Sequence, residues 1–265
     1  MSSALTVLKE QINNFYLARR LSVYEVKSAN SSNYLGILWE IISPMIQISI
    51  YWFVFGFGIF NRGEDFLPWL MAGIVVWFFV TATTTQVSKS IYTRLNMVSK
   101  MSFPLSVIPT YVIFAKLYQH LLLLGVIIIL LGFTGYLPTF YIIQLPYFLI
   151  ATVTLLFSFG LISSTLSTII RDVQNLIGSL MRVLFYLTPI LWVIDAKDHP
   201  LIADIMKLNP LYYIVEGYRA SLLGESWYLV VHWEYTLYFW GVVILLFLIG
   251  SSLHVRFRDR FVDFK

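Results

Sequence analysis

Residues 105–133 read LSVIPTYVIFAKLYQHLLLLGVIIILLGF, and this stretch decides the fold class. It carries a single charged residue, Lys116, and is longer than the roughly 20 apolar residues that a helix needs to cross a bilayer. Five other stretches are apolar over a comparable length: Gly36–Phe60, Pro68–Ser88, Thr139–Ile170, Asn175–Ile194 and Leu229–Ser252. These runs do not alternate apolar and polar residues as membrane β-strands do. The sequence therefore predicts an all-α polytopic membrane protein with six transmembrane helices.

The composition excludes most other classes of protein. Of the 265 residues, 58% are hydrophobic and 12% are charged, whereas about a quarter of the residues in a soluble domain are charged. A soluble enzyme and a disordered chain are both excluded on this ground. The chain has no cysteine, which rules out disulfides, thiolate metal sites and cysteine nucleophiles.

The basic residues predict the orientation. Lysine and arginine concentrate before the first span, between the second and third, between the fourth and fifth, and after the last. The members of this set are Lys9, Arg19, Arg20, Lys27, Lys89, Arg94, Lys100, Arg171, Arg256, Arg258, Arg260 and Lys265. The opposite segments carry only Arg62, Lys197, Lys207 and Arg219 over a greater total length. Because basic loops stay inside, both termini are predicted to be cytoplasmic.

Two regions outside the spans have helical patterns of their own. The segment Leu5–Tyr16 places apolar residues at helical spacing and polar residues opposite them, which predicts an amphipathic helix in the cytoplasmic interface. Its apolar face consists of Leu5, Leu8, Ile12 and Phe15. On the outer side, the segment Asp195–Tyr228 contains apolar patches too short to cross. They predict short re-entrant outer helices before the last span.

The sequence shows no catalytic or metal-binding pattern. No glycine is followed by lysine, so a P-loop is absent and no cofactor is expected in this chain. The histidines His120, His199, His232 and His254 are scattered, which is typical of structural residues. The run of serine and threonine near Ser163 has no accompanying base and is interpreted as helix packing. No nucleic-acid partner is expected.

Charged and aromatic residues inside the spans leave two interpretations open. Glu40, Lys116 and Arg182 lie near enough to span ends to reach the interface, but charges inside a membrane are often functional. Aromatic side chains pack against lipid and core, or line a path along which sugar rings stack. The candidates for such a path are Tyr51, Trp77, Tyr118, Phe185 and Tyr186.

Several short motifs follow one another along this topology. They are Tyr34-Leu35-Gly36-Ile37-Leu38-Trp39 with Ser43-Pro44, Asn96-Met97-Val98-Ser99-Lys100 with Phe103-Pro104, Arg171-Asp172-Val173, Thr188-Pro189-Ile190, Asn209-Pro210, and Glu216-Gly217-Tyr218-Arg219 with Leu222-Leu223-Gly224. In this order they resemble the membrane subunit of ABC-2 type polysaccharide exporters. Within that family the stretch Asn33–Gly36 and the ending Leu253–Phe264 are most similar to wall teichoic acid translocation permeases of Gram-positive bacteria.

The resemblance implies one ABC-2 transmembrane domain of the type V exporter kind over residues 1–265. Residues 1–35 would form the interfacial and gate helices, 36–252 the six-span bundle, and 253–265 a cytoplasmic tail. Two copies in the bacterial cytoplasmic membrane would form the path. Two separate ATPase subunits would bind ATP and Mg²⁺ and hydrolyse the ATP, which explains why this chain needs no P-loop.

The resemblance also assigns candidate residues. The loop with Asn96, Lys100, Phe103 and Pro104 would dock on the ATPase. The substrate would be a glycopolymer on undecaprenyl diphosphate, and Arg19, Arg20 and Lys27 would lie level with that diphosphate. An attraction of the same residues to anionic lipids explains them equally well. Glu216 and Arg219, three residues apart, are interpreted as a pair that holds the outer segment.

Three other functions stay open from the sequence. An ion-coupled secondary carrier would need acids in mid-membrane and internal repeats, and neither is seen. An ABC-2 exporter of another polysaccharide or a small molecule would share the topology. A scaffold for envelope enzymes would bind partners without transporting anything.

Overall fold

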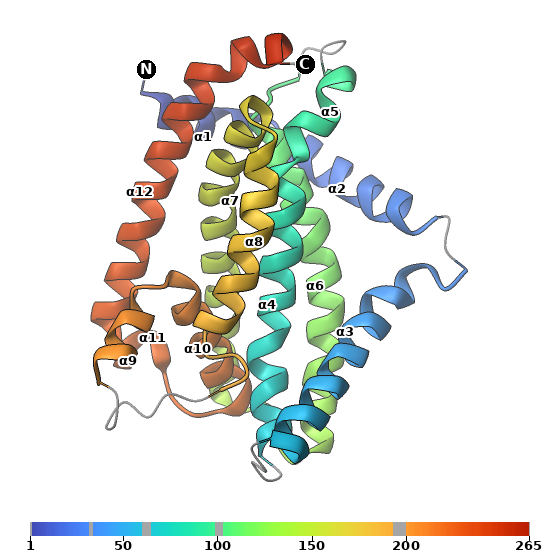
Figure 1. Cartoon of the computed structure of the whole chain (residues 1–265), viewed down its shortest axis with the longest axis vertical. Helices are drawn as coiled ribbons and strands as arrows, with labels where there is room; N and C mark the ends of the chain where they lie inside the picture. The colour runs from blue at the N-terminus through green and yellow to red at the C-terminus, as the bar shows by residue number, and fades with distance from the viewer. Residues whose placement is uncertain (1, 32–33, 60–64, 99–102, 193–199, 265) are drawn as a thin grey trace.

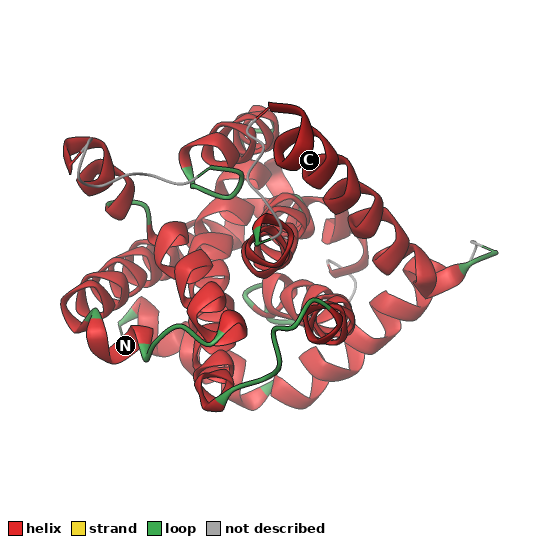
Figure 2. Ribbon diagram, turned by 90° about the horizontal axis from the view of Figure 1, so that it is seen from below, coloured by secondary structure: helices red, strands yellow, loops and turns green. Residues whose placement is uncertain are grey.

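The computed structural model describes residues 2–31, 34–59, 65–98, 103–192 and 200–264, and within these ranges every regular element is a helix (Figures 1 and 2). The long helices are α3 (Trp39–Tyr51) with the π-helix η2 (Trp52–Ile59), α4 (Phe66–Ser88), α6 (Val107–Phe133), α7 (Leu145–Ile169), α8 (Asp172–Leu187) and α12 (Trp233–Phe257). The shorter elements are α1 (Ser3–Asn13), α2 (Phe15–Asn30), η1 (Gly36–Leu38), α5 (Ser90–Val98), η3 (Phe140–Gln144), α9 (Pro200–Lys207), α10 (Pro210–Leu223), α11 (Tyr228–Val231) and η4 (Arg258–Phe264).

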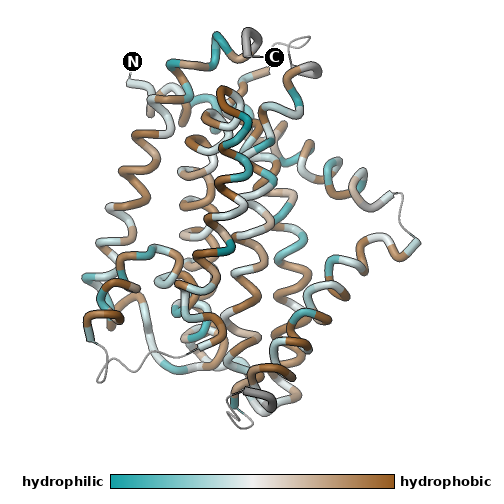
Figure 3. Tube along the Cα trace, viewed as in Figure 1, coloured by the Kyte–Doolittle hydropathy of each residue, from teal (hydrophilic) through white to brown (hydrophobic). Residues whose placement is uncertain are grey.

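Five of the predicted spans are helices long and apolar enough to cross a membrane. They cover Gly36–Gly56, Phe66–Ser88, Val107–Phe133, Phe140–Ile169 and Trp233–Phe261. Hydrophobic residues dominate these helices along most of their length, while hydrophilic residues gather near both termini (Figure 3). Both termini lie at the same end of the bundle (Figure 1), which is the end predicted to be cytoplasmic. The chain is thus a multi-pass membrane protein.

The fifth predicted span differs from the expected Asn175–Ile194. Helix α8 begins earlier, at Asp172, and ends at Leu187. Its 16 residues rise about 24 Å, less than the roughly 30 Å of a hydrocarbon core. The reason is Pro189, which disfavours helical backbone at the residue before it. Thr188 is accordingly extended, with φ −90° and ψ 127°.

Helix α4 is the centre of the bundle. It packs against α6, α7, α8 and α10, and 72% of its most apolar stretch is buried. The first span is at the other extreme, with 6% of its stretch buried. Figure 1 shows why: α3 meets the bundle at the predicted outer end and leans away from it toward the cytoplasmic end. One face of α4 and α8 is therefore left open toward α3.

The helices α1 and α2 lie at the end of the bundle where both termini are found, which is the end predicted to be cytoplasmic (Figure 1). Helix α1 packs on α12 and buries Val7, while α2 packs on α6. The expected helix Leu5–Tyr16 is divided, because α1 ends at Asn13 and α2 begins at Phe15. Leu5, Leu8 and Ile12 are exposed on α1, whereas the Phe15 ring packs edge-on against Phe114 of α6 with the centroids 5.8 Å apart. Apolar side chains in this position suit the boundary between headgroups and acyl chains.

Helix α10 corresponds to one of the short re-entrant helices predicted for the outer side. Asn209 caps its first turn by accepting a hydrogen bond from the Leu211 amide at 3.0 Å, and Gly224 ends it with φ 75°. The helix packs against both α4 and α7. Gly217 makes the close approach to α7 possible, because a Cβ there would lie 2.1 Å from Cε1 of Phe148.

We expect Gly217→Ala to lower the free energy of unfolding by about 1–3 kcal/mol, the usual effect of overpacking. The Phe148 ring is hemmed in by Tyr147, Tyr213 and Tyr228, so it has little freedom to move aside. Thermal unfolding in detergent measures the effect. Gly241→Ala in α12 is the matched control, since a Cβ at Gly241 meets no atom within 4 Å. Equal melting temperatures for the two variants would contradict this packing.

Candidate functional site

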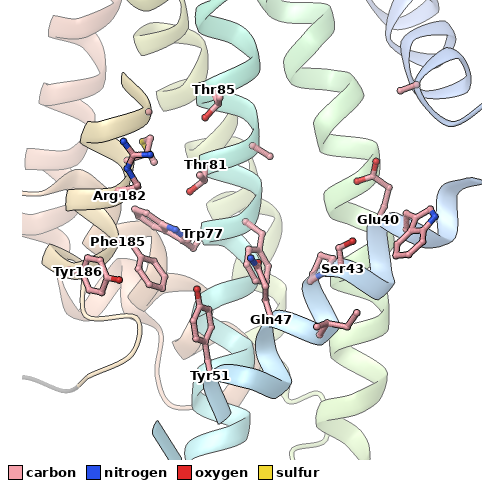
Figure 4. A pocket seen from close by; sticks show the side chains of 18 residues that line it. Glu40, Ser43, Gln47, Tyr51, Trp77, Thr81, Thr85, Arg182, Phe185 and Tyr186 are labelled. Atoms are coloured by element: carbon pink, nitrogen blue, oxygen red, sulfur yellow. The ribbon is translucent and has the colours of Figure 1, made fainter. Parts of the chain in front are cut away.

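The largest feature of the open face is a cavity of about 980 Å³ between α3, α4 and α8 (Figure 4). Helix α3 supplies Glu40, Ser43, Gln47 and Tyr51, α4 supplies Trp77, Thr81 and Thr85, and α8 supplies Arg182, Phe185 and Tyr186. Ala29, near the end of α2, also borders it. Four of the five aromatic residues predicted to line a path are therefore brought together here.

The aromatic part of the wall is centred on Phe185. Its ring centroid lies 5.8 Å from that of Tyr51, 5.6 Å from that of Trp77 and 5.3 Å from that of Tyr186. Spacings of this size are typical of rings that support one another. The wall thus offers a continuous apolar surface with phenol and indole groups at its edges.

The fifth aromatic candidate, Tyr118, does not line this cavity. It lies on α6 and is 36% exposed. Its neighbours Gln119 and His120 are buried, and Gln119 bonds Glu40 on α3. Successive helical residues point about 100° apart, so the turn of α6 that directs Gln119 toward α3 directs Tyr118 elsewhere.

The polar part of the wall consists of hydroxyl, amide and charged groups. Thr85 and Ser43 are exposed and carry hydroxyls, whereas the hydroxyl oxygen of Thr81 is buried. Arg182 is exposed, with its Nη2 donating to Ser179 Oγ at 2.9 Å. In a bilayer, such groups are stable only beside water or another protein surface. The cavity is therefore suited to a hydrated or hydroxylated occupant.

The basic candidates lie on α2, outside the cavity. Arg19, Arg20 and Lys27 are all exposed on this helix. Helix α2 runs from the bundle toward the start of α3 (Figure 1), and Ala29 near its end lies at the cavity rim. The resemblance also implies a gate at Tyr24–Asn33. This segment begins on the same helix with Tyr24 exposed, and residues 32–33 lie outside the described residues.

The predicted ATPase-docking loop is described only at its edges. Lys100 lies outside the described residues, and the backbone of Asn96 belongs to α5. Phe103 and Pro104 are half-buried, and Phe103 packs on the core. Two contacts connect this region to the interfacial helices. Arg94 pairs with Glu25 of α2, and Ser106 accepts a 2.9 Å hydrogen bond at its carbonyl from Gln11 Nε2 of α1.

The outer segment is held by Arg219, whose side chain is almost fully buried. Its Nη1 lies 2.5 Å from Glu216 Oε1, so the two predicted residues do pair. Its Nη2 donates to the Ile190 carbonyl at 3.2 Å, in the turn that follows α8. The guanidinium carbon lies 3.5 Å from the ring centroid of Trp69 on α4. One side chain thus joins α10, α4 and the end of α8.

Comparison with known proteins gives the family. The model of the ABC-2 type transporter family matches residues 16–223, which is most of the chain. This protein belongs to the ABC-2 type transporter family.

Three similar proteins carry the same name, O-antigen export system permease protein RfbA. Two are from Klebsiella pneumoniae: one is 26% identical over 262 residues and the other 25% identical over 260, each covering 97% of this permease and 98% of the relative. The third, from Myxococcus xanthus, is 23% identical over 197 residues, covering 74% of this chain and 76% of the relative.

Some residues of this ABC-2 permease that shape the site had no signal in the sequence. Trp69 contacts Arg219, but nothing in its local pattern sets it apart from other apolar residues. Ile190 was named only as part of the motif Thr188-Pro189-Ile190, which did not indicate its contact with Arg219. Gln119 donates to Glu40 Oε1 at 2.7 Å across 79 positions of sequence. The only available hint was that a polar side chain in the middle of an apolar run requires a partner.

We expect Arg219→Met to destabilise the permease by about 3–5 kcal/mol, because it leaves Glu216 without its cation and the Ile190 carbonyl without a donor. Thermal unfolding in detergent, followed by size-exclusion chromatography, measures the loss. Arg182→Met is the control, since Arg182 is exposed and a change there is expected to stay within about 0.5 kcal/mol. Equal stability of the two variants would show that Arg219 does not hold α10, α4 and the end of α8 together.

Proposed function

We propose that this chain is the permease subunit of an ABC exporter that carries a polysaccharide across the bacterial cytoplasmic membrane. The observation that carries the proposal is the cavity in which Tyr51, Trp77 and Phe185 stand opposite hydroxyl and amide side chains. Sugar rings stack on aromatic faces, while their hydroxyls bond polar edges. The near full-length similarity to O-antigen export permeases supports the same class of substrate.

The finer proposal is a glycopolymer linked to undecaprenyl diphosphate, with wall teichoic acid as the first candidate. Arg19, Arg20 and Lys27 support it, because they are exposed on α2 and this helix leads to the cavity rim at Ala29. Arginine binds phosphate oxygens with two parallel hydrogen bonds. A diphosphate held at α2 would place the attached polymer at the mouth of the cavity.

The path requires a second copy of the chain. The cavity is open, and it exposes Arg182, Gln47 and Tyr186 on a face that would otherwise meet acyl chains. Exposed charge and amide groups at this depth are costly unless water or protein covers them. A homodimer whose two cavities face each other encloses these groups in one channel.

Energy would come from two separate ATPase subunits that hold ATP and Mg²⁺. This chain has no P-loop of its own. The region of α5 through Pro104 is the proposed docking site, and movement there would be passed on through the Arg94–Glu25 and Gln11–Ser106 contacts. Helices α1 and α2 would then shift together with the coupling region.

The test is ATP hydrolysis by the permease reconstituted in liposomes with its co-encoded ATPase. We expect undecaprenyl-diphosphate-linked glycopolymer to raise turnover and to be moved across the bilayer. Replacing Phe103 with alanine should reduce the stimulated rate to the basal rate. Phe133→Ala is the control, since Phe133 is an exposed phenylalanine at the opposite end of α6.

The outcomes separate the levels of the proposal. Stimulation by teichoic acid but not by another lipid-linked polysaccharide would support the finer assignment. A stable complex whose ATP turnover responds to neither polymer would be consistent with an ABC transporter but would overturn the assignment of a polysaccharide as its substrate. Transport by the permease alone, abolished when the proton gradient is collapsed, would point instead to an ion-coupled carrier.

A further inference from the structure

A small recess opens beside the main cavity, between α3, α4 and α6. Its volume is about 100 Å³, and it shares four wall residues with the cavity: Glu40, Pro44, Phe78 and Ala82. Figure 4 shows Glu40 next to α6, at the end of the cavity opposite Tyr186. The recess is therefore a side branch of the proposed path and lies next to none of the α8 residues that form its aromatic wall.

The recess contains a buried polar group in need of a partner. Gln119 is 8% exposed, and its Nε2 donates to Glu40 Oε1 at 2.7 Å. Its carbonyl oxygen, Oε1, finds no hydrogen-bond partner among the described residues. A buried acceptor left without a donor is unfavourable, so the site favours any ligand that supplies one.

The walls that α4 and α6 contribute to the recess are held in place by side-chain contacts. The His120 ring stacks on Phe79 with the centroids 4.6 Å apart and the planes 16° from parallel. His120 Nε2 lies 3.1 Å from the Tyr218 hydroxyl of α10, the residue next to Arg219. This side of the recess is thus formed before a ligand arrives, which limits the ordering that binding requires there.

The charges around the recess select the chemistry of the ligand. Glu40 repels an anion such as phosphate, and Lys116, which also lines the recess, repels a cation. A neutral hydroxyl satisfies both sides, because it accepts from the Lys116 ammonium and donates to the Gln119 carbonyl. The volume matches about three water molecules at about 30 Å³ each, enough for a short hydroxylated arm and too little for a stacked ring.

We infer that this recess binds a hydroxyl-bearing side arm of the exported polymer and so reads the chemistry of its repeat unit. The inference rests on the proposed function, since it needs the polymer to pass through the cavity. Gln119, Glu40 and Lys116 are the residues that recognise the arm, while the aromatic wall across the cavity holds the chain without regard to its substituents.

The test compares two forms of one substrate in the reconstituted complex with its ATPase. The first is an undecaprenyl-diphosphate-linked glycopolymer with free hydroxyls, and the second is the same polymer after O-acetylation, which removes the donors. We expect the intact polymer to stimulate ATP hydrolysis at a concentration about fivefold lower than the acetylated one, the effect of about one hydrogen bond.

Two variants locate that preference in the recess. Gln119→Leu removes the unpaired carbonyl, and Ala82→Leu fills the recess without replacing a polar side chain. Both should respond to the two polymers at equal concentrations. Thr85→Leu is the matched control: it adds bulk on the same helix, lines the main cavity alone, and should keep the preference.

Each result decides between the claims. If the wild-type complex responds equally to both polymers, or if Ala82→Leu keeps the preference, the recess does not read hydroxyls, although the proposed function stands. If Thr85→Leu loses the preference along with the recess variants, the discrimination belongs to the main cavity and the inference fails. If neither polymer stimulates the wild-type complex, the proposed function fails and the inference with it.

Discussion

The arrangement of this permease depends on one buried guanidinium. Arg219 lies inside the bundle, where an unpaired charge is not tolerated, and its charge is balanced by Glu216 and by the face of Trp69. The same group bonds the Ile190 carbonyl and so holds the turn at which α8 ends. Because α10 is secured in this way, a helix too short to cross the membrane can close the outer end of the bundle. The central helix α4 is then packed against α6, α7, α8 and α10, and the open face that α4 and α8 share is the one toward α3.

That free face is where the proposed transport takes place. The first span touches the bundle at its predicted outer end and separates from it toward the end where the termini lie, so a polar and aromatic wall is exposed within the thickness of the membrane. The outer segment is firmly held and α3 is loosely attached, which suggests which helices move during transport and which stay in place. Docking of an ATPase near Pro104 would shift α1, α2 and α3, to which α2 leads, while α4, α7 and α10 stay fixed.

Much of the fold was predictable from the sequence. The parts that were not predictable depend on contacts between helices that are distant in the sequence. Hydropathy predicts five of the spans, and helical spacing predicts the surface helix and the pairing of Glu216 with Arg219. Pro189 indicates that α8 ends early, but the apolar residues on both sides of it made the segment look like one continuous span. The rotation of α6 turns Gln119 toward α3 and Tyr118 away from it. It depends on contacts with α3, and the sequence of α6 alone does not indicate which of its faces meets that helix. The approach of Gly217 to Phe148 is likewise a property of the assembled bundle.

The central claim is that the polymer passes along the wall formed by α3, α4 and α8. It is tested most directly by placing a photoreactive phenylalanine analogue at position 185 or, as control, at position 118, which is exposed outside the cavity. The complex is trapped with a hydrolysis-deficient ATPase and radiolabelled lipid-linked glycopolymer, then irradiated. The account predicts that the label attaches at position 185 and not at 118. Labelling at 118 equal to or above that at 185 would contradict it.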